Sequence, residues 1–208
     1  MHTRLAPIYN LGFTAASLRP ELARIVAEHF LTTGDWPTTK QWVLSTNALQ
    51  CRSTSSAVRL ERELRSRLQS LTAEQVKVMA QATEDDRTAM SWLAAMKHSA
   101  MLFDFAAEVL REKLALHDPV LRPSDYETFV AHKSAIHHGL TELSATSKNK
   151  IRQVLLKMLH EVGILQNGPA MGNIQRPALS PELVRVISAD SPHWLAGFLV
   201  PDPEISPY

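Results

Sequence analysis

Residues 144–176 have the sequence SATSKNKIRQVLLKMLHEVGILQNGPAMGNIQR, and this stretch decides the expected fold. A hydroxyl-rich turn around Ser147 precedes a basic amphipathic segment, which Gly163 should end. A short apolar run, a tip rich in Gly, Pro and Asn, and a second short run follow. This order predicts a helix-turn-helix and a short β-hairpin over Leu143 to Arg176. A winged-helix module presents one helix and one hairpin to a nucleic acid in this way.

The apolar residues between Lys148 and Val162 fall on one arc of a helix. They are Ile151, Val154, Leu155, Met158 and Val162. The residues that project away from this arc include Asn149, Lys150, Gln153, Lys157 and His160. Because Asn and Gln can read adenine edges and Lys or Arg can bind phosphate or guanine, this polar side is a candidate recognition face. We expect Ser147 to cap the helix and to leave its N-terminal amides near a phosphate.

Blander interpretations of the same residues stay open. An ordinary amphipathic helix with a solvated basic face gives the same pattern. Leu156 and Leu159 widen the apolar arc toward Arg152, whose flank could pack against another helix. Arg176 lies on the returning run, where a contact to DNA and a plain surface position both fit. The candidate nucleic-acid contacts of this module are Ser147, Lys148, Asn149, Lys150, Arg152, Gln153, Lys157 and Arg176.

A second basic helix is expected at Ser55 to Leu71, within a possible helix-turn-helix over residues 36–71. Two of its glutamates precede an arginine by four residues and should form intrahelical ion pairs worth only about 0.2 to 0.5 kcal/mol each. These pairs are Glu61 with Arg65 and Glu63 with Arg67. The cations left to contact a polyanion are Arg52, Arg59 and Arg62.

Charge distribution, and not net charge, carries the case for a nucleic acid. The 208 residues have a formal net charge of +1, with 22 Lys and Arg against 21 Asp and Glu. The segment from Lys148 to Lys157, however, contains four cations and no acid. The composition, 45% hydrophobic, is that of a globular protein with room for one large or two small domains.

Apolar spacing and capping residues predict a mainly α fold, a compact helical bundle followed by the winged-helix-like module. Expected helices before the module cover about residues 15–31, 36–46, 55–71, 73–82, 85–97, 99–116 and 125–140. The two prolines within Asp118 to Pro123 suggest a boundary, with a helical domain at 1–118 and a winged-helix-like domain at 119–208. Ser180-Pro181 and Ser191-Pro192 indicate two short C-terminal helices, and the tail PDPEISPY is expected to be mobile.

Features of enzymes, metal sites and membrane proteins are not found in the sequence. It has no Gly-rich phosphate loop, Gly-x-Ser-x-Gly or HExxH motif, and the lone Cys51 rules out an internal disulfide. The spacing of His132, His137 and His138 does not suit a shared metal ion. Asp104 and Glu108 are expected to form a polar edge or to bind an arginine. We therefore expect no cofactor, no metal and no membrane span, and the N-terminus lacks a signal-peptide pattern, which favours the cytoplasm.

Three blocks of the chain resemble the BrxA family, the small A components of BREX phage-defence systems. They are YNLGFTAASLRPELARIVAEHFLTTGDW at 9–36, ALQCRSTSSAVRLERELRSRLQSLT at 48–72 and LSATSKNKIRQVLLKMLHEVGIL at 143–165. The resemblance implies a helical, NusB-like region, binding to double-stranded DNA and an accessory role in restricting phage. It supplies no catalytic residue.

Residues and resemblance together predict a non-enzymatic protein that binds double-stranded DNA beside other BREX proteins. Contacts to phosphate should dominate, with weak sequence preference. One alternative is a winged-helix transcription regulator. Another is a scaffold that docks a protein partner or RNA while its basic helix is merely solvated.

Overall fold

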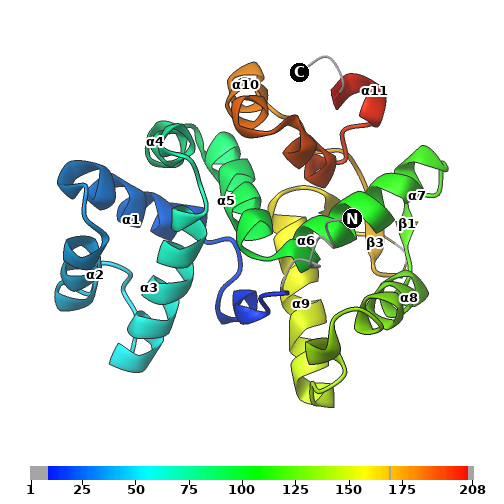
Figure 1. Cartoon of the computed structure of the whole chain (residues 1–208), viewed down its shortest axis with the longest axis horizontal. Coiled ribbons are helices and arrows are strands. Elements are labelled where there is room, and N and C mark those ends of the chain that lie inside the picture. Colours follow the sequence, from blue (N-terminus) through cyan, green and yellow to red (C-terminus); the bar gives the residue numbers. More distant parts are fainter. Residues whose placement is uncertain (1–8, 169, 206–208) are drawn as a thin grey trace, which may run out of the picture.

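The computed structural model describes residues 9–168 and 170–205, and most of this part of the chain is helical. Helices α1 to α5 follow a short 3-10 turn, η1 (Gly12–Ala15) (Figure 1). They are α1 (Pro20–Thr33), α2 (Trp36–Ser45), α3 (Thr54–Gln69), α4 (Ala73–Gln81) and α5 (Glu84–His98). A continuous helical run then comprises α6 (Ala100–Asp104), the π-helical η2 (Phe105–Leu110) and α7 (Arg111–Ala115). The predicted mainly α fold is confirmed.

The second half of the chain alternates short strands with helices. Its elements are β1 (Val120–Leu121), α8 (Pro123–Ser134), η3 (His138–Leu140), α9 (Ala145–Glu161), β2 (Leu165–Gln166), β3 (Gly172–Ile174), α10 (Pro181–Asp190), η4 (Pro192–Phe198) and α11 (Asp202–Ile205). The strands form an antiparallel sheet of order β1-β3-β2. The predicted hairpin is therefore present, and it gains β1 as a third strand.

Backbone geometry explains why the hairpin turns where it does. Gly172 has φ +127°, and a Cβ there would lie 2.4 Å from the carbonyl oxygen of Gln166, so only glycine fits. Leu165 pairs with Ile174 and Gln166 with Asn173. On the other edge of β3, Ile174 donates its backbone N–H to the Pro119 carbonyl at 2.6 Å. Each strand is thus held at a fixed register against its neighbour.

Several predicted boundaries are wrong. Ser147 does not cap α9, because the helix begins three residues earlier and the Ser144 Oγ accepts the Ser147 backbone N–H at 3.2 Å. The helix expected at 125–140 ends at Ser134. The tail expected to be mobile forms α11 up to Ile205, while residues 206–208, like the N-terminal residues 1–8 and Pro169 of the hairpin tip, lie outside the described residues.

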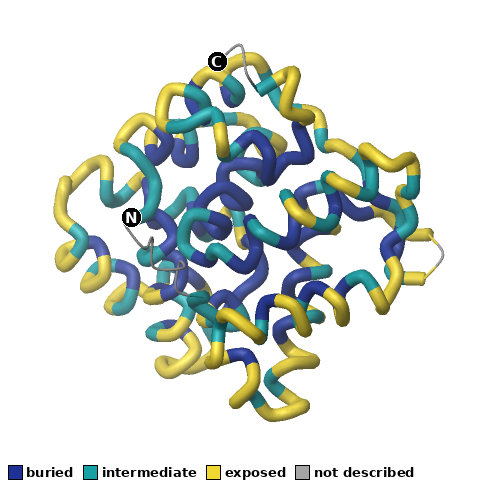
Figure 2. Tube along the Cα trace, turned by 45° about the vertical axis from the view of Figure 1, so that its right-hand side comes forward, coloured by how far each residue is buried: buried dark blue, intermediate teal, exposed yellow. Residues whose placement is uncertain are grey.

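Buried side chains from both halves belong to one hydrophobic cluster, which Figure 2 shows running through the middle of the molecule. Helix α5 lies centrally, and its fully buried Trp92 donates its indole N–H to the Gly197 carbonyl of η4 at 3.0 Å. Gly197 has no room for a side chain, since a Cβ would lie 2.3 Å from the Met96 sulfur. The C-terminal helices therefore pack on α4, α5 and α6, and the boundary at residue 118 stays a prediction.

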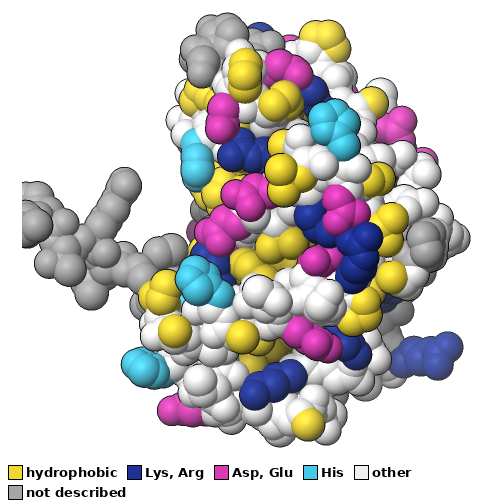
Figure 3. All heavy atoms as spheres, turned by 90° about the vertical axis from the view of Figure 1, so that its right-hand side faces the viewer, with side chains coloured by type: hydrophobic (Ala, Val, Ile, Leu, Met, Phe, Trp, Pro, Cys, Tyr) yellow, Lys and Arg dark blue, Asp and Glu magenta, His cyan; other side chains and the backbone are white. Residues whose placement is uncertain are grey.

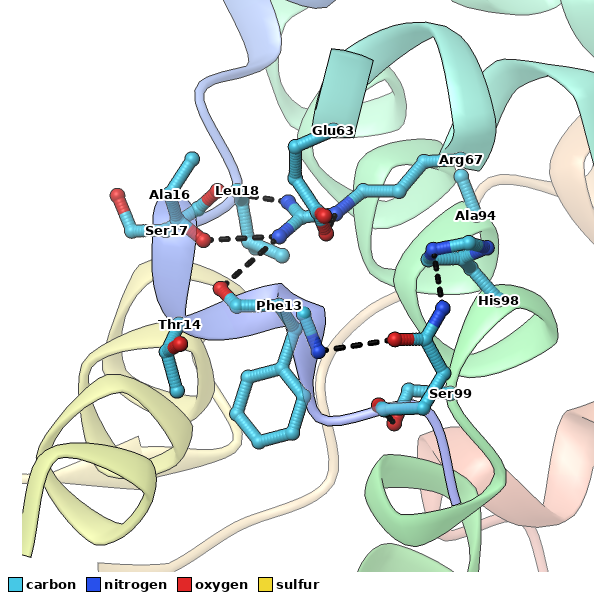
Figure 4. Close-up of polar contacts among 12 residues, drawn as sticks. Phe13, Thr14, Ala16, Ser17, Leu18, Glu63, Arg67, Ala94, His98 and Ser99 are labelled. Atoms are coloured by element: carbon cyan, nitrogen blue, oxygen red, sulfur yellow. Dashed lines mark hydrogen bonds and ion pairs between the residues drawn. The ribbon is translucent and has the colours of Figure 1, made fainter. Parts of the chain in front are cut away.

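A buried arginine connects α3 to the N-terminal segment (Figure 4). The guanidinium of Arg67 donates to the carbonyls of Ser17 at 2.7 Å, Ala16 at 2.8 Å and Phe13 at 3.3 Å. Its Nε donates to Glu63 Oε1 at 2.8 Å, so the predicted pair exists, but it is buried. Because the pair is buried, removing only one partner would leave an uncompensated charge in the interior, which costs more than breaking an exposed pair.

The same N-terminal segment also reaches α9. Turn η1 packs against both α3 and α9. At the C-terminal end of α9, Glu161 Oε2 accepts the backbone N–H of Leu18 at 2.8 Å. Residues 12–18 thus hold the two basic helices in a fixed relation to one another.

Candidate nucleic-acid interface

Helix α9 separates its apolar and polar sides as the sequence predicts. The side chains of Ile151, Val154, Leu155, Met158 and Leu159 are buried in the core. The exposed residues along the opposite side are Lys148, Asn149, Lys150, Gln153, Lys157 and His160. Gly163 follows the helix with φ +76°, a left-handed conformation that ends it where expected. The candidate recognition face is therefore exposed along most of the helix.

Within residues 9–168 and 170–205, the lysines at the N-terminal end of α9 have no acidic partner. Among the described residues, Lys148 and Lys150 form no ion pair. Lys157, about two turns beyond Lys150, has its Nζ 3.9 Å from Glu161 Oε1. Positive charge that is not neutralised within the protein thus concentrates in the first two turns, where the helix dipole is also positive.

Arg152 does not share the fully exposed face. It is half-buried on the side of α9 toward α8, and its Nη2 donates to Asn149 Oδ1 at 3.1 Å. The prediction that this flank could pack against another helix fits its position. Arg152 and Lys148 line a groove between α8 and α9, described further below.

The hairpin adds little positive charge to the face. Residues 163–175 contain no lysine or arginine. Arg176, at the base of the hairpin, forms a two-bonded pair with Glu204 of α11, with Nη1 to Oε1 at 2.9 Å and Nη2 to Oε2 at 2.7 Å. Arg176 is therefore paired within the protein, and this pair lowers the pKa of Glu204.

Helix α3 carries the second group of candidates. The turn between α2 and α3 contains two residues in the left-handed region, Asn47 and Gln50, and Ser53 caps α3 by accepting the Ser56 backbone N–H at 3.2 Å. The predicted cations Arg52, Arg59 and Arg62 are all exposed. Figure 1 shows the N-terminal halves of α3 and α9 extending on the same, lower side of the molecule, with η1 between them.

The side of the molecule formed by α7 and α8 carries charges of both signs (Figure 3). Figure 3, which looks onto the side of the molecule formed by α7 and α8, shows acidic and basic side chains interspersed with apolar ones. Ion pairs such as Lys113 with Asp118 at 2.7 Å and Arg122 with Asp118 at 2.7 Å account for this pattern, and both cations lower the pKa of Asp118. A polyanion therefore meets no continuous basic surface on this side.

One polar cluster around the buried Lys133 was predicted only in part. Asp104 and Glu108 do bind a cation, but it is Lys133, at 2.8 Å and 2.7 Å, and not an arginine. The Tyr9 hydroxyl also donates to Asp104, at 2.6 Å. The one-turn spacing of Asp104 and Glu108 is visible in the sequence. No sequence signal connects Asp104 to Lys133, 29 positions away, or to Tyr9, 95 positions away. This cluster fastens the N-terminal segment to α8.

Within the described ranges, no group of His, Cys, Asp and Glu residues could hold a metal ion. His137 instead stacks on Tyr9 with ring centroids 3.7 Å apart. No helix of the described chain has the length and apolar character needed to span a membrane.

Comparisons with known proteins place the chain in a family. A model of the BrxA family matches residues 7–191. BREX protein BrxA from Escherichia coli O9:H4 (strain HS) is 30% identical over 165 residues, which cover 79% of this chain and 77% of the relative. BREX protein BrxA from Bacillus cereus (strain H3081.97) is 24% identical over 150 residues, covering 72% and 75%.

A solved structure supports the fold. The crystal structure of an uncharacterized protein from Magnetospirillum magneticum superimposes with a TM-score of 0.76 at 19% identity, over 93% of this chain and 98% of that one. The resemblance found in the sequence is thus confirmed, and the chain belongs to the BrxA family.

Proposed function

We propose that this protein is a non-enzymatic component of a BREX phage-defence system that binds double-stranded DNA mainly through phosphate contacts. The observation that carries the proposal is the N-terminal half of α9. Lys148 and Lys150 are exposed there without an ion pair among the described residues, next to the exposed Asn149 and Gln153. A lysine without an acidic partner in the protein can bind a DNA phosphate and displace a counterion from it.

The order of elements supports the same function. From α7 the chain runs through β1, α8, α9, β2 and β3, with the sheet order β1-β3-β2. A helix followed by a hairpin is the arrangement of a winged-helix DNA-binding module, in which α9 is the recognition helix. The cation-free hairpin in this chain leaves most phosphate contacts to the helix, and contacts to phosphate carry no sequence information directly. Sequence preference should therefore be weak.

A second contact region on α3 fits the proposal. Arg59 and Arg62 are exposed, and α3 is held to α9 through η1, with both N-terminal halves on one side of the molecule. One duplex that passes along this side could meet both helices. The names of the E. coli and B. cereus relatives suggest that the protein works beside other BREX components.

A salt titration of binding to duplex DNA tests the proposal. The variant Lys148→Ala/Lys150→Ala should reduce the dependence of log affinity on log salt by about 1.8, because each lost phosphate contact removes about 0.9. The control Lys77→Ala/Arg185→Ala removes two exposed cations from α4 and α10 and should leave the slope unchanged. A folded Lys148→Ala/Lys150→Ala variant with wild-type affinity and slope would exclude α9 as the contact.

A protein-docking or RNA-binding scaffold is the second candidate, favoured by the near-neutral net charge and by the mixed charges of the α7 and α8 side. The same titration with single-stranded DNA and RNA separates these possibilities. Negligible affinity for all three nucleic acids, together with stable co-purification with a BREX protein, would favour the docking role.

A further inference from the structure

A groove of about 650 Å³ lies between α8 and the first turns of α9. Its volume falls within the roughly 300 to 1,000 Å³ of small-molecule sites in proteins. Most of its lining is apolar and comes from Met101, Val130, Ala131, Leu140, Leu143 and Ile151. The polar groups on its walls include Tyr126 and Glu127 of α8 and Lys148 and Arg152 of α9.

Tyr126 is the buried polar residue of this groove. The residue is 7% exposed, and its ring meets Phe105 edge-on at a centroid distance of 5.8 Å. No hydrogen bond to its hydroxyl is found within the described part of the chain. The hydroxyl oxygen is not among the fully buried polar atoms that lack a partner, so it opens to the groove, where water or a ligand can accept its hydrogen bond. Burial raises the pKa of Tyr126 to about 12, against an opposing effect of the nearby Arg152, so the hydroxyl keeps its proton and can donate it.

Two cations on α9 share the groove with this hydroxyl. Lys148 and Arg152 are four residues apart, which places them on the same side of the helix, where like charges repel. Neither forms an ion pair among the described residues. Glu127, on α8, also lines the groove but is exposed and forms no ion pair with either of them in the described structure. An anion bound between Lys148 and Arg152 would relieve their repulsion.

We propose that this groove is a binding site for a small organic anion with an apolar body of one or two rings. Its acidic group would accept hydrogen bonds from Lys148, Arg152 and the Tyr126 hydroxyl, while its body packs on Val130, Leu143 and the other apolar walls. Because Lys148 also belongs to the candidate DNA face, an occupied groove should compete with duplex DNA. This last consequence rests on the proposed function, whereas the binding site itself does not.

Naphthalene-2-sulfonate, a fluorescent anion whose apolar body is two fused rings, is a direct probe. The full-length protein should bind one equivalent saturably. We expect Arg152→Gln and Tyr126→Phe each to weaken binding about tenfold, because each removes one donor to the sulfonate. Ala131→Trp, which fills the groove from the exposed side of α8, should weaken it at least as much.

A second groove on α10 supplies the matched control. It is also about 650 Å³ and contains an arginine, but Arg185 is paired with Glu182 at 2.6 Å. Arg185→Gln and Ala189→Trp should leave probe binding unchanged within about twofold, consistent with surface substitutions. Unsaturable binding, or equal losses in both sets of variants, would overturn the proposal. Tyr126→Phe keeps the ring packing, so its result stands even where Ala131→Trp perturbs folding, which thermal melts would reveal.

Competition between the probe and duplex DNA is measured in the same samples. Probe at ten times its dissociation constant should raise the apparent dissociation constant for duplex DNA about elevenfold if the two ligands exclude each other. Normal probe binding by a protein that binds no duplex DNA would overturn the proposed function and leave the anion site standing. Normal binding of both ligands without competition would overturn the shared use of Lys148.

Discussion

Helices α3 and α9 start from similar sequence and use their charges in opposite ways. Each is amphipathic, rich in cations and capped by a serine, Ser53 or Ser144. Helix α3 buries Glu61, Glu63 and Arg67 together with its apolar residues. Helix α9 buries apolar residues alone.

This difference in burial follows from the positions of the acidic residues along each helix. On α3, Arg65 and Arg67 each have a glutamate one turn before them. Arg67 is buried and also donates to three carbonyls of the N-terminal segment. On α9 the segment from Lys148 to Lys157 contains no acid, so its lysines stay at the surface. Charges paired within a helix can serve the fold, while charges without such partners remain available to a ligand.

The largest expected effect is the loss of the Arg67 contacts. Arg67→Met should lower the free energy of unfolding by about 3 to 5 kcal/mol, because it leaves buried Glu63 and three carbonyls without their donor. Arg62→Met, on the exposed side of the same helix, should change it by less than about 0.5 kcal/mol. Urea denaturation measures both. Similar losses in the two variants would show that α3 does not divide its arginines in this way.

The capping serines should matter equally in the two helices. Ser144→Ala and Ser53→Ala each remove a side-chain acceptor from one N-terminal backbone N–H and should cost about 1 kcal/mol. Ser147→Ala is the control, because Ser147 lies inside the first turn and does not cap α9. A greater loss for Ser147→Ala than for Ser144→Ala, again by urea denaturation, would restore the helix start predicted from the sequence.

The smallest expected effect on stability comes from giving α9 a pattern like that of α3. Gln153→Glu places an acid four residues before Lys157 and should stabilise the helix by about 0.2 to 0.5 kcal/mol. It should also weaken binding to duplex DNA, because it adds negative charge to the candidate face. Gln153→Ala separates the loss of the amide from the added charge. Unchanged DNA affinity for Gln153→Glu would mean that this position does not face DNA.

Patterns among neighbouring residues predicted the helices and the hairpin. Contacts between residues far apart in the sequence could not be predicted from such patterns. The apolar arc of α9, the glycine at its end and the ion pairs of α3 all depend on residues within a few positions of one another. The burial of Arg67 depends on carbonyls about fifty positions away, which spacing does not reveal. Strand β1 has only two residues, and it forms because it pairs with residues 172–173 of β3, flanked by hydrogen bonds from the Met171 and Ile174 N–H groups.

In the candidate site, too, features set by local periodicity were predictable and features set by tertiary contacts were not. Exposure of Lys148, Lys150, Arg59 and Arg62 followed from the helical periodicity. The pairing of Arg176 with Glu204 did not, because it depends on how α11 folds back. The groove beside Arg152 also required the packing of α8 against α9 to be known.

Lysine footprinting tests the central claim, contact between α9 and duplex DNA, most directly in the unmodified protein. Amine-reactive labelling followed by mass spectrometry reports each lysine with and without saturating duplex at low salt. Lys148 and Lys150 should be strongly protected by DNA, whereas the exposed Lys77 of α4 should label at the same rate in both samples. Equal labelling of Lys148 and Lys150 in bound and free protein would contradict the account.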